Sequence, residues 1–151
     1  MSVNAIDDNL AYEQAHGSAV QDHLGYRLVE WAEDHAVVEL EMQEFHRNRV
    51  GILHGGILTT LMDTASGYAV CFCPVAGNIR KTMTLSLTTN FIGMAKGGLV
   101  RVVARKQGGG RKIVFTEAVA YNADGDVIGT ATGTFKYHRG SDDPDGLPRD
   151  A

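Results

Sequence analysis

Hydrophobic and polar residues alternate along most of the second half of the chain. In residues 82–91, TMTLSLTTNF, apolar side chains alternate with threonine, serine and asparagine. This period of two predicts a strand with one dry face and one wet face. Three more strand patterns follow at residues 98–107, 112–121 and 126–138. Glycine and Asp-Gly steps between them favour hairpin turns, because they adopt positive φ at little cost.

The first half of the chain contains two helical patterns around one hairpin pattern. Residues 8–28 have the pattern of one or two short helices. Residues 26–31 and 36–42 predict two paired strands, because apolar residues alternate with glutamates in the second of them. A longer helix is expected from Gly55 to about Val70, since a proline and a glycine interrupt the chain soon after it.

The helix predicted at residues 55–70 is apolar on one side. Its apolar residues fall within an arc of about 140° at 100° per residue. They are Ile57, Leu58, Leu61, Met62, Ala65, Tyr68 and Ala69. One long helix among so many strands predicts an α+β fold in which a curved antiparallel β-sheet wraps around this helix. We expect residues 1–138 to form a single domain and the charged residues 139–151 to be a disordered tail.

Composition narrows the class of protein. A length of 151 residues suits one domain, and a net charge of -4 argues against nucleic acid as the main partner. No apolar run reaches the roughly 18 residues of a membrane span, and the acidic N-terminal residues do not resemble a secretory signal. Cys71 and Cys73 are the only cysteines, so the sequence argues against a disulfide framework and against a metal site. We therefore expect a reduced, cytoplasmic protein with no membrane partner.

The other face of the helix at residues 55–70 carries small residues and one acid. Its members are Gly56, Thr59, Thr60, Asp63, Ser66 and Gly67. A helix face in contact with water alone usually carries lysine, glutamate or arginine. Close packing against another element is therefore one interpretation, and a solvated Asp63 is the other.

The glycines at the start of this helix offer a complementary feature. Backbone N–H groups in the first helical turn have no partner within the helix, and Gly55 and Gly56 have no side chains to shield them. They also lie at the positive end of the helix dipole, where a carbonyl oxygen or an oxyanion would be stabilised. A glycine-rich loop that only allows the chain to turn is the alternative.

Geometry limits how the acid and the glycines can work together. Asp63 is eight residues after Gly55, or about 12 Å along the helix axis at 1.5 Å per residue. A nucleophile or base must approach its target to about 3 Å. One helix therefore cannot present both groups to one carbon atom, whereas two antiparallel copies can. This reasoning predicts a homodimer with two equivalent composite sites.

The stretch around this helix resembles the hotdog-fold acyl-CoA thioesterases of the PaaI-like branch. The resemblance rests on Asn48, Gly51, His54-Gly55-Gly56, Leu61 and Asp63, with matching spacing, and on the strand order that follows. It extends over about residues 22–138. It implies dimers, which are often paired into tetramers, and hydrolysis of acyl-CoA without a cofactor or metal.

The resemblance also implies roles for individual residues. The N–H of Gly55 would bind the thioester carbonyl, and Asp63 of the other subunit would be the nucleophile or the base that activates water. Asn48 and His54 would lie near the carbonyl and the water, although a histidine there can also be only a helix cap. A threonine near the start of the next long strand would lie close to the acid. Alignment favours Thr84, with Thr82 as its alternative.

The parts of the site that hold the substrate are less defined. Two groups of basic residues are candidate partners for the phosphates of coenzyme A. One group flanks the glycine hairpin at residues 108–110, and the other is a pair before residue 82. They are Arg105, Lys106, Arg111 and Lys112, followed by Arg80 and Lys81. Leu58, Leu61 and Met62 are candidate acyl contacts or plain core residues. Competing functions are a non-catalytic acyl-CoA or lipid sensor, a hotdog dehydratase and a structural dimerisation module.

Overall fold

The computed structural model describes residues 3–150, with side chains from Asp8 onward. Its helices are α1 (Val3–Ala15), α2 (Ala19–Leu24), the single 3-10 turn η1 (Glu44–His46) and α3 (Gly55–Val70). Its strands are β1 (Arg27–Ala32), β2 (His35–Glu41), β3 (Asn78–Ile79), β4 (Thr82–Phe91), β5 (Leu99–Gly109), β6 (Ile113–Tyr121), β7 (Val127–Tyr137) and β8 (Leu147–Pro148).

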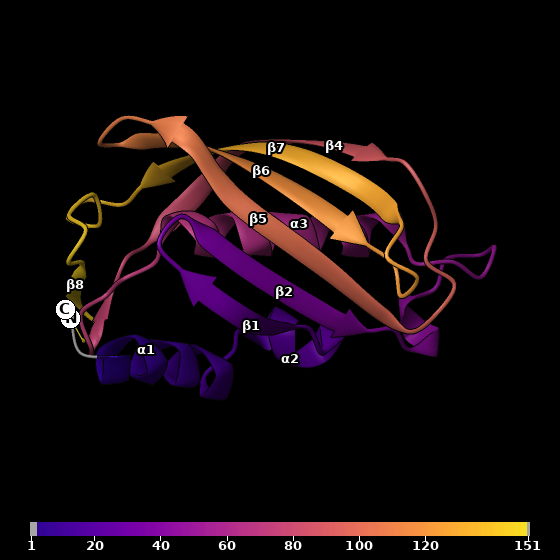
Figure 1. Cartoon of the computed structure of the whole chain (residues 1–151), viewed down its shortest axis with the longest axis horizontal. Coiled ribbons are helices and arrows are strands. Elements are labelled where there is room, and N and C mark those ends of the chain that lie inside the picture. Colours follow the sequence, from indigo (N-terminus) through magenta and orange to yellow (C-terminus); the bar gives the residue numbers. More distant parts are fainter. Residues whose placement is uncertain (1–2, 151) are drawn as a thin grey trace.

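Six of these strands form one antiparallel sheet in the order β1-β2-β5-β6-β7-β4. The sheet curves around α3, which lies across its inner face, while α1 and α2 lie beside β1 (Figure 1). The core fills the space between α3 and the sheet. The predicted α+β fold, a curved sheet around one long helix, is confirmed. No helix within residues 3–150 is long and apolar enough to cross a membrane.

Helix α3 has the bounds that its sequence pattern predicts. Leu61, Met62 and Ala65 of the apolar arc are fully buried against the sheet. Ser66 is also fully buried, although the sequence analysis assigned it to the open face. It lies four residues after Met62 and three before Ala69, so it extends the buried stripe by one position. The open face of α3 is therefore narrower than expected.

Strand β4 is an edge strand with an interrupted pattern. Its pairing with β7 shifts register between Thr84 and Ser86, so Leu85 has no partner. Such a bulge reverses the alternation of side chains beyond it. As a result, Thr84 and Leu87 both lie on the α3 side, although they are three residues apart. Met83 and Leu85, expected on the dry face, are about half exposed at 48% and 50%.

Residues 139–150, which composition predicts to be disordered, make specific contacts with the domain. Strand β8 pairs with β3, and Ser141 is buried. The Ser141 hydroxyl accepts a hydrogen bond from the Lys81 N–H at 2.9 Å, and its carbonyl accepts one from Arg80 Nε at 3.0 Å. This segment has little apolar surface to bury, which is why composition predicts disorder. Hydrogen bonds hold it against the residues that lead into β4.

Replacing Ser141 with alanine is expected to destabilise the protein by about 0.5–1.5 kcal/mol, because the hydrogen bond from the Lys81 N–H to the buried Ser141 hydroxyl is lost. Urea denaturation of the wild type and of Ser141→Ala measures this difference. The exposed Ser86→Ala is the control and is expected to change stability by less than about 0.5 kcal/mol. Equal stability of Ser141→Ala and the wild type would contradict the assigned hydrogen bond.

Candidate active site

Asp63 and Thr84 form a polar pair on the open side of α3. The Thr84 hydroxyl donates a hydrogen bond to Asp63 Oδ1 at 2.7 Å. Asp63 itself is half-buried, and its second carboxylate oxygen, Oδ2, makes no hydrogen bond within the described residues. The structure therefore brings Thr84, rather than Thr82, to the acid. Thr82 and Thr84 lie on the same face of β4, opposite Tyr137 and Phe135 of β7, and the Thr84 hydroxyl is the one that reaches Asp63.

His54 is the N-cap of α3. Its Nδ1 accepts a hydrogen bond from the Gly56 N–H at 2.9 Å, so a neutral His54 carries its proton on Nε2. A side chain at position 56 would crowd the ring, since an added Cβ would lie 3.1 Å from Nδ1. Glycine at this position thus permits the cap, and the Gly56 N–H is occupied by it.

The Gly55 N–H is left as the available donor at this helix end. It has no hydrogen-bond partner among residues 3–150, whereas Ile57 and Leu58 both donate to the His54 carbonyl. Gly55 also lines a pocket of about 200 Å³, which we call the Gly55 pocket. Its other walls include Asn48, Leu58, Phe91, Met94 and Ile128. A free N–H at the positive end of a helix dipole, beside an apolar pocket, suits a carbonyl group attached to an apolar chain.

Asn48 shapes the loop in front of α3. Its side-chain oxygen accepts hydrogen bonds from the N–H groups of Val50 at 3.0 Å and Ile52 at 3.3 Å. Arg47 secures the same loop by donating to the carbonyls of Gly51 at 2.6 Å and Lys96 at 2.7 Å. The amide nitrogen of Asn48 makes no hydrogen bond among the described residues, so it can contact a ligand in the Gly55 pocket. Sequence reasoning missed Arg47, whose contacts depend on a loop distant in sequence.

The basic residues proposed from the sequence lie in different places. Lys106 pairs with Asp34 at 3.5 Å, and Arg105 lies on the outer face of the sheet. Arg80 donates to the carbonyls of Ser141 and Phe72 and stacks over Tyr137, so it supports the fold. Met62 is fully buried and is a core residue, whereas Leu58 is buried and also lines the Gly55 pocket.

Lys112 belongs to a second pocket, of about 480 Å³, which we call the basic pocket. Lys136, His138 and Arg139 line it with Lys112, next to Met83 of β4. Its one acid, Asp142, accepts a hydrogen bond from Arg111, which lowers the pKa of the Asp142 carboxyl. Lys112, Lys136 and Arg139 have no acidic partner among the described side chains. Sequence reasoning missed Lys136 and Arg139 because they come from the end of β7 and the residues after it.

Two other side chains of reactive types, Cys71 and His46, have structural roles. Burial raises the pKa of the Cys71 thiol to about 12, so it stays protonated at neutral pH and does not act as a nucleophile. His46 is fully buried, with Nδ1 accepting from the Gln43 N–H and Nε2 donating to the Leu24 carbonyl. Both ring nitrogens are therefore used to hold the loop, and neither is free for a metal or a substrate.

This fold, with an acid and a free glycine N–H on one helix, defines the hotdog class of proteins that act on thioesters. The model of the thioesterase superfamily matches residues 50–128, and the chain belongs to this family. The matched residues run from the loop before α3 to the start of β7 and include Gly55, Asp63 and Thr84, whereas Asn48 lies just before them. The predicted resemblance to hotdog thioesterases is confirmed.

Many solved structures are similar to this chain, and three of them follow. The conserved protein PA5202 of Pseudomonas aeruginosa is 34% identical with a TM-score of 0.74, and the match covers 85% of this chain and 99% of that one. The PaaI protein of the phenylacetic acid degradation operon of E. coli is 20% identical with a TM-score of 0.76, over 89% and 96%. The smu.793 protein of Streptococcus mutans, solved bound to acetyl-CoA, is 24% identical with a TM-score of 0.64, over 75% and 88%. These structures show the fold, and the family match supports hydrolysis of thioesters.

Proposed function

We propose that this protein is an acyl-CoA thioesterase that works as a homodimer with two composite sites. The observation that carries the proposal is the separation of its polar groups along α3. The free Gly55 N–H lies at the N-terminus, and Asp63, held by Thr84, lies about 12 Å further along the axis. Neither end of the helix alone provides both an oxyanion donor and a base.

The exposed edge of the sheet supports the dimer. Strand β4 leaves one row of backbone N–H and C=O groups unpaired within this chain. Large apolar side chains are exposed along it and just after it, namely Met83, Leu85, Phe91, Ile92 and Met94. A long apolar edge strand is avoided in monomers because it pairs with other chains. Antiparallel pairing of two copies of β4 would turn each α3 against the other's.

In the proposed reaction, the thioester carbonyl oxygen accepts a hydrogen bond from Gly55 of one subunit. Asp63 of the other subunit takes a proton from water while the water oxygen bonds to the carbonyl carbon, or it attacks that carbon itself. In the first route the C–S bond then breaks, and the sulfur of coenzyme A gains the proton that Asp63 took from water. In the second route coenzyme A leaves as a thiolate, and water then hydrolyses the acyl anhydride on Asp63 and supplies the proton that the thiolate takes up. The Thr84 hydroxyl holds Oδ1 in both routes and leaves Oδ2 to react.

The basic pocket suits the phosphates of coenzyme A as the carrier of the acyl group. Lys112, Lys136 and Arg139 surround a hollow beside Met83, on the face of edge strand β4 opposite to Thr84, and phosphate oxygens accept charge-assisted hydrogen bonds from such groups. The protein of the same fold from Streptococcus mutans binds acetyl-CoA, which supports a coenzyme A thioester as a ligand for the fold. An acidic acyl carrier protein is the alternative carrier.

The proposal is tested by measuring free thiol release from a panel of acyl-CoA thioesters, together with the mass of the protein in solution. Hydrolysis by a dimer, or by a dimer of dimers, is the expected result. Binding of acyl-CoA without thiol release would instead identify a non-catalytic acyl-CoA-binding protein. A monomer with full activity would contradict the composite site.

Replacing Thr84 with valine is expected to lower kcat about tenfold to a hundredfold, because a hydrogen bond to a charged group contributes about 1.5–3 kcal/mol. Steady-state kinetics on the best acyl-CoA substrate measure the effect. Thr82→Val is the matched control and is expected to keep wild-type activity, since Thr82 makes no hydrogen bond to Asp63. A larger loss in Thr82→Val than in Thr84→Val would reverse the assignment.

Replacing Lys136 with alanine is expected to raise KM for acyl-CoA about threefold to tenfold with little change in kcat, because one phosphate contact is lost at an exposed site. The difference from the wild type is expected to shrink in 1 M salt, where charges are screened. Lys106→Ala is the control, because Lys106 already pairs with Asp34. Equal KM values for the wild type and Lys136→Ala with coenzyme A thioesters would exclude this pocket as the phosphate site.

A further inference from the structure

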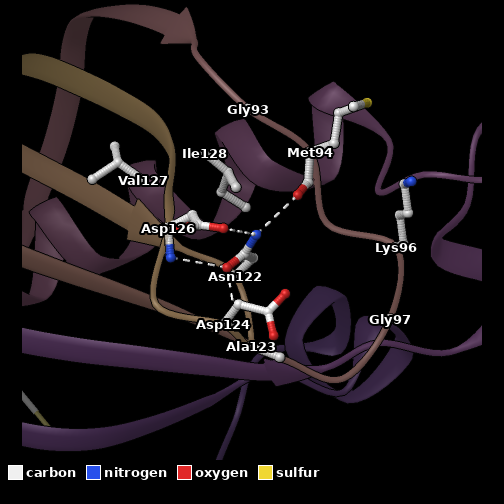
Figure 2. A pocket seen from close by; sticks show the side chains of 10 residues that line it. All are labelled: Gly93, Met94, Lys96, Gly97, Asn122, Ala123, Asp124, Asp126, Val127 and Ile128. Atoms are coloured by element: carbon white, nitrogen blue, oxygen red, sulfur yellow. Dashed lines mark hydrogen bonds between the residues drawn. The ribbon is translucent and has the colours of Figure 1, made fainter.

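Two cavities meet at the segment that follows β4. The Gly55 pocket, of about 200 Å³, lies on one side of this segment. A second cavity of about 370 Å³, which we call the hairpin pocket, lies between the segment and the β6–β7 turn, residues 122–126 (Figure 2). Gly93, Met94 and Ile128 line both cavities, so these residues form the wall between them.

The backbone of this wall is fixed at several points. The side-chain amide of Asn122 donates a hydrogen bond to the Met94 carbonyl at 3.2 Å, as Figure 2 shows. The Gly93 N–H donates to the Ile128 carbonyl at 3.1 Å, and the Leu53 N–H donates to the Ala95 carbonyl at 2.9 Å. The segment cannot move as a whole without breaking these hydrogen bonds, so the side chains decide how open the wall is.

The two side chains of the wall differ in their freedom. Ile128 is only 1% exposed and belongs to the core, whereas Met94 is 56% exposed. Methionine is unbranched and flexible, so its side chain adapts to what it contacts. In Figure 2 the Met94 side chain points away from Asn122 and Asp124, while its backbone carbonyl faces them. Met94 is therefore the part of the wall that can be shortened without disturbing the core.

The size of the Gly55 pocket sets a limit on its ligand. An apolar cavity of about 150 Å³ holds one benzene molecule. A pocket of about 200 Å³ therefore holds an acyl group of similar size, and a longer chain meets the wall at Met94. Beyond the wall, the hairpin pocket offers Ala123 and Val127 together with the charged groups Lys96, Asp124 and Asp126.

We infer that Met94 is a specificity-determining residue that closes the acyl end of the Gly55 pocket and restricts the enzyme to short acyl groups. This inference rests on the proposed thioesterase function. The carbonyl group is held at the Gly55 N–H, the acyl chain extends along Leu58 and Ile128, and Met94 limits its length. Removal of the Met94 side chain joins the Gly55 pocket to the hairpin pocket.

The test compares wild type, Met94→Ala and Met94→Trp on straight-chain acyl-CoA thioesters of increasing length. For the first chain length beyond the wild-type optimum, Met94→Ala is expected to raise kcat/KM about tenfold, since one methylene in an apolar pocket changes kcat/KM by about 10-fold or more. Met94→Trp is expected to move the optimum to shorter chains. Val20→Ala is the control, because Val20 of α2 is also about half exposed but lies outside both cavities and outside the basic pocket.

A second measurement separates this inference from the proposed function. S-alkyl-coenzyme A thioethers cannot be hydrolysed, so calorimetry measures how their binding affinity depends on chain length without turnover. If thiol release is absent but Met94→Ala binds longer thioethers more tightly than the wild type does, the proposed reaction is wrong and the role of Met94 stands. If both assays give the same length profile for the wild type and Met94→Ala, the role of Met94 is wrong, whatever the reaction.

Discussion

Replacing Asp63 with asparagine is expected to lower kcat for thioester hydrolysis by about 10²- to 10⁴-fold, the usual contribution of a positioned acid or base. The amide can neither take a proton from water nor attack the carbonyl carbon as a carboxylate does. It retains an oxygen that accepts the hydrogen bond from Thr84, so the local structure is expected to persist. Thiol release under substrate saturation measures the loss, and KM is expected to change little.

Two measurements make this result specific. The melting temperature of Asp63→Asn should match that of the wild type, since the residue is half-buried and keeps its partner. Hydrolysis in ¹⁸O-labelled water under single turnover tests for the anhydride. Label found on the Asp63 carboxylate indicates an anhydride opened at the Asp63 carbonyl, whereas label found only in the released acid indicates that water attacks the acyl carbon. Unchanged kcat in Asp63→Asn would remove Asp63 from the mechanism.

Replacing Gly55 with proline is expected to lower kcat by about 10²- to 10³-fold, the loss measured when one oxyanion donor is removed. Proline lacks the N–H but fits the first position of a helix. Gly55 is the first residue of α3, and His54 before it has φ -64 and ψ 129, an extended conformation that a following proline favours. The substitution therefore removes the donor while α3 keeps its start.

Gly55→Ala is the matched control for this experiment. Its Cβ would lie 3.2 Å from the ring of Phe91, as the ring of a proline would, but its N–H is retained. The exposed Phe91 ring can move by a few tenths of an ångström, so Gly55→Ala is expected to stay within about tenfold of the wild type. A loss in Gly55→Ala as large as that in Gly55→Pro would assign the effect to crowding.

Mixing the two inactive variants tests whether the site is shared. In a mixed dimer, the subunit with Asp63→Asn still offers its Gly55 N–H, and the subunit with Gly55→Pro still offers its Asp63. Random exchange therefore restores about a quarter of wild-type activity, since half of the dimers are mixed and each has one intact site. No recovery after verified subunit exchange would mean that the two groups do not act across an interface.

Sequence patterns predicted the elements that carry the site. The bounds of α3 follow from the glycine pair, the apolar stripe and the break after it, and those of β4 follow from its alternation. The bulge after Thr84 was not predictable, because a strictly alternating sequence gives no sign of an inserted residue. Thr82 and Thr84 lie on the same face of β4, so the choice between them depends on which hydroxyl reaches Asp63 and required the structure.

Long-range polar contacts account for most of the remaining differences. Ser141 was assigned to a disordered tail because its segment has little apolar surface, and the carbonyl and hydroxyl contacts that hold it involve residues far away in sequence. The basic pocket combines Lys112 with residues from the end of β7, so no local pattern reveals it. Gly56 was expected to donate to a ligand, but the ring of His54 accepts its N–H.

The contacts of Arg149 have a consequence for the order of folding. Arg149 donates to Asn9 Oδ1 at 2.5 Å and stacks 3.6 Å from the centre of the Tyr12 ring, which joins positions 140 residues apart. Contacts between such distant residues close very long loops and form late. During synthesis on a ribosome these two contacts can form only after residue 149 has emerged. We therefore expect α1 to acquire amide-exchange protection after the central sheet does.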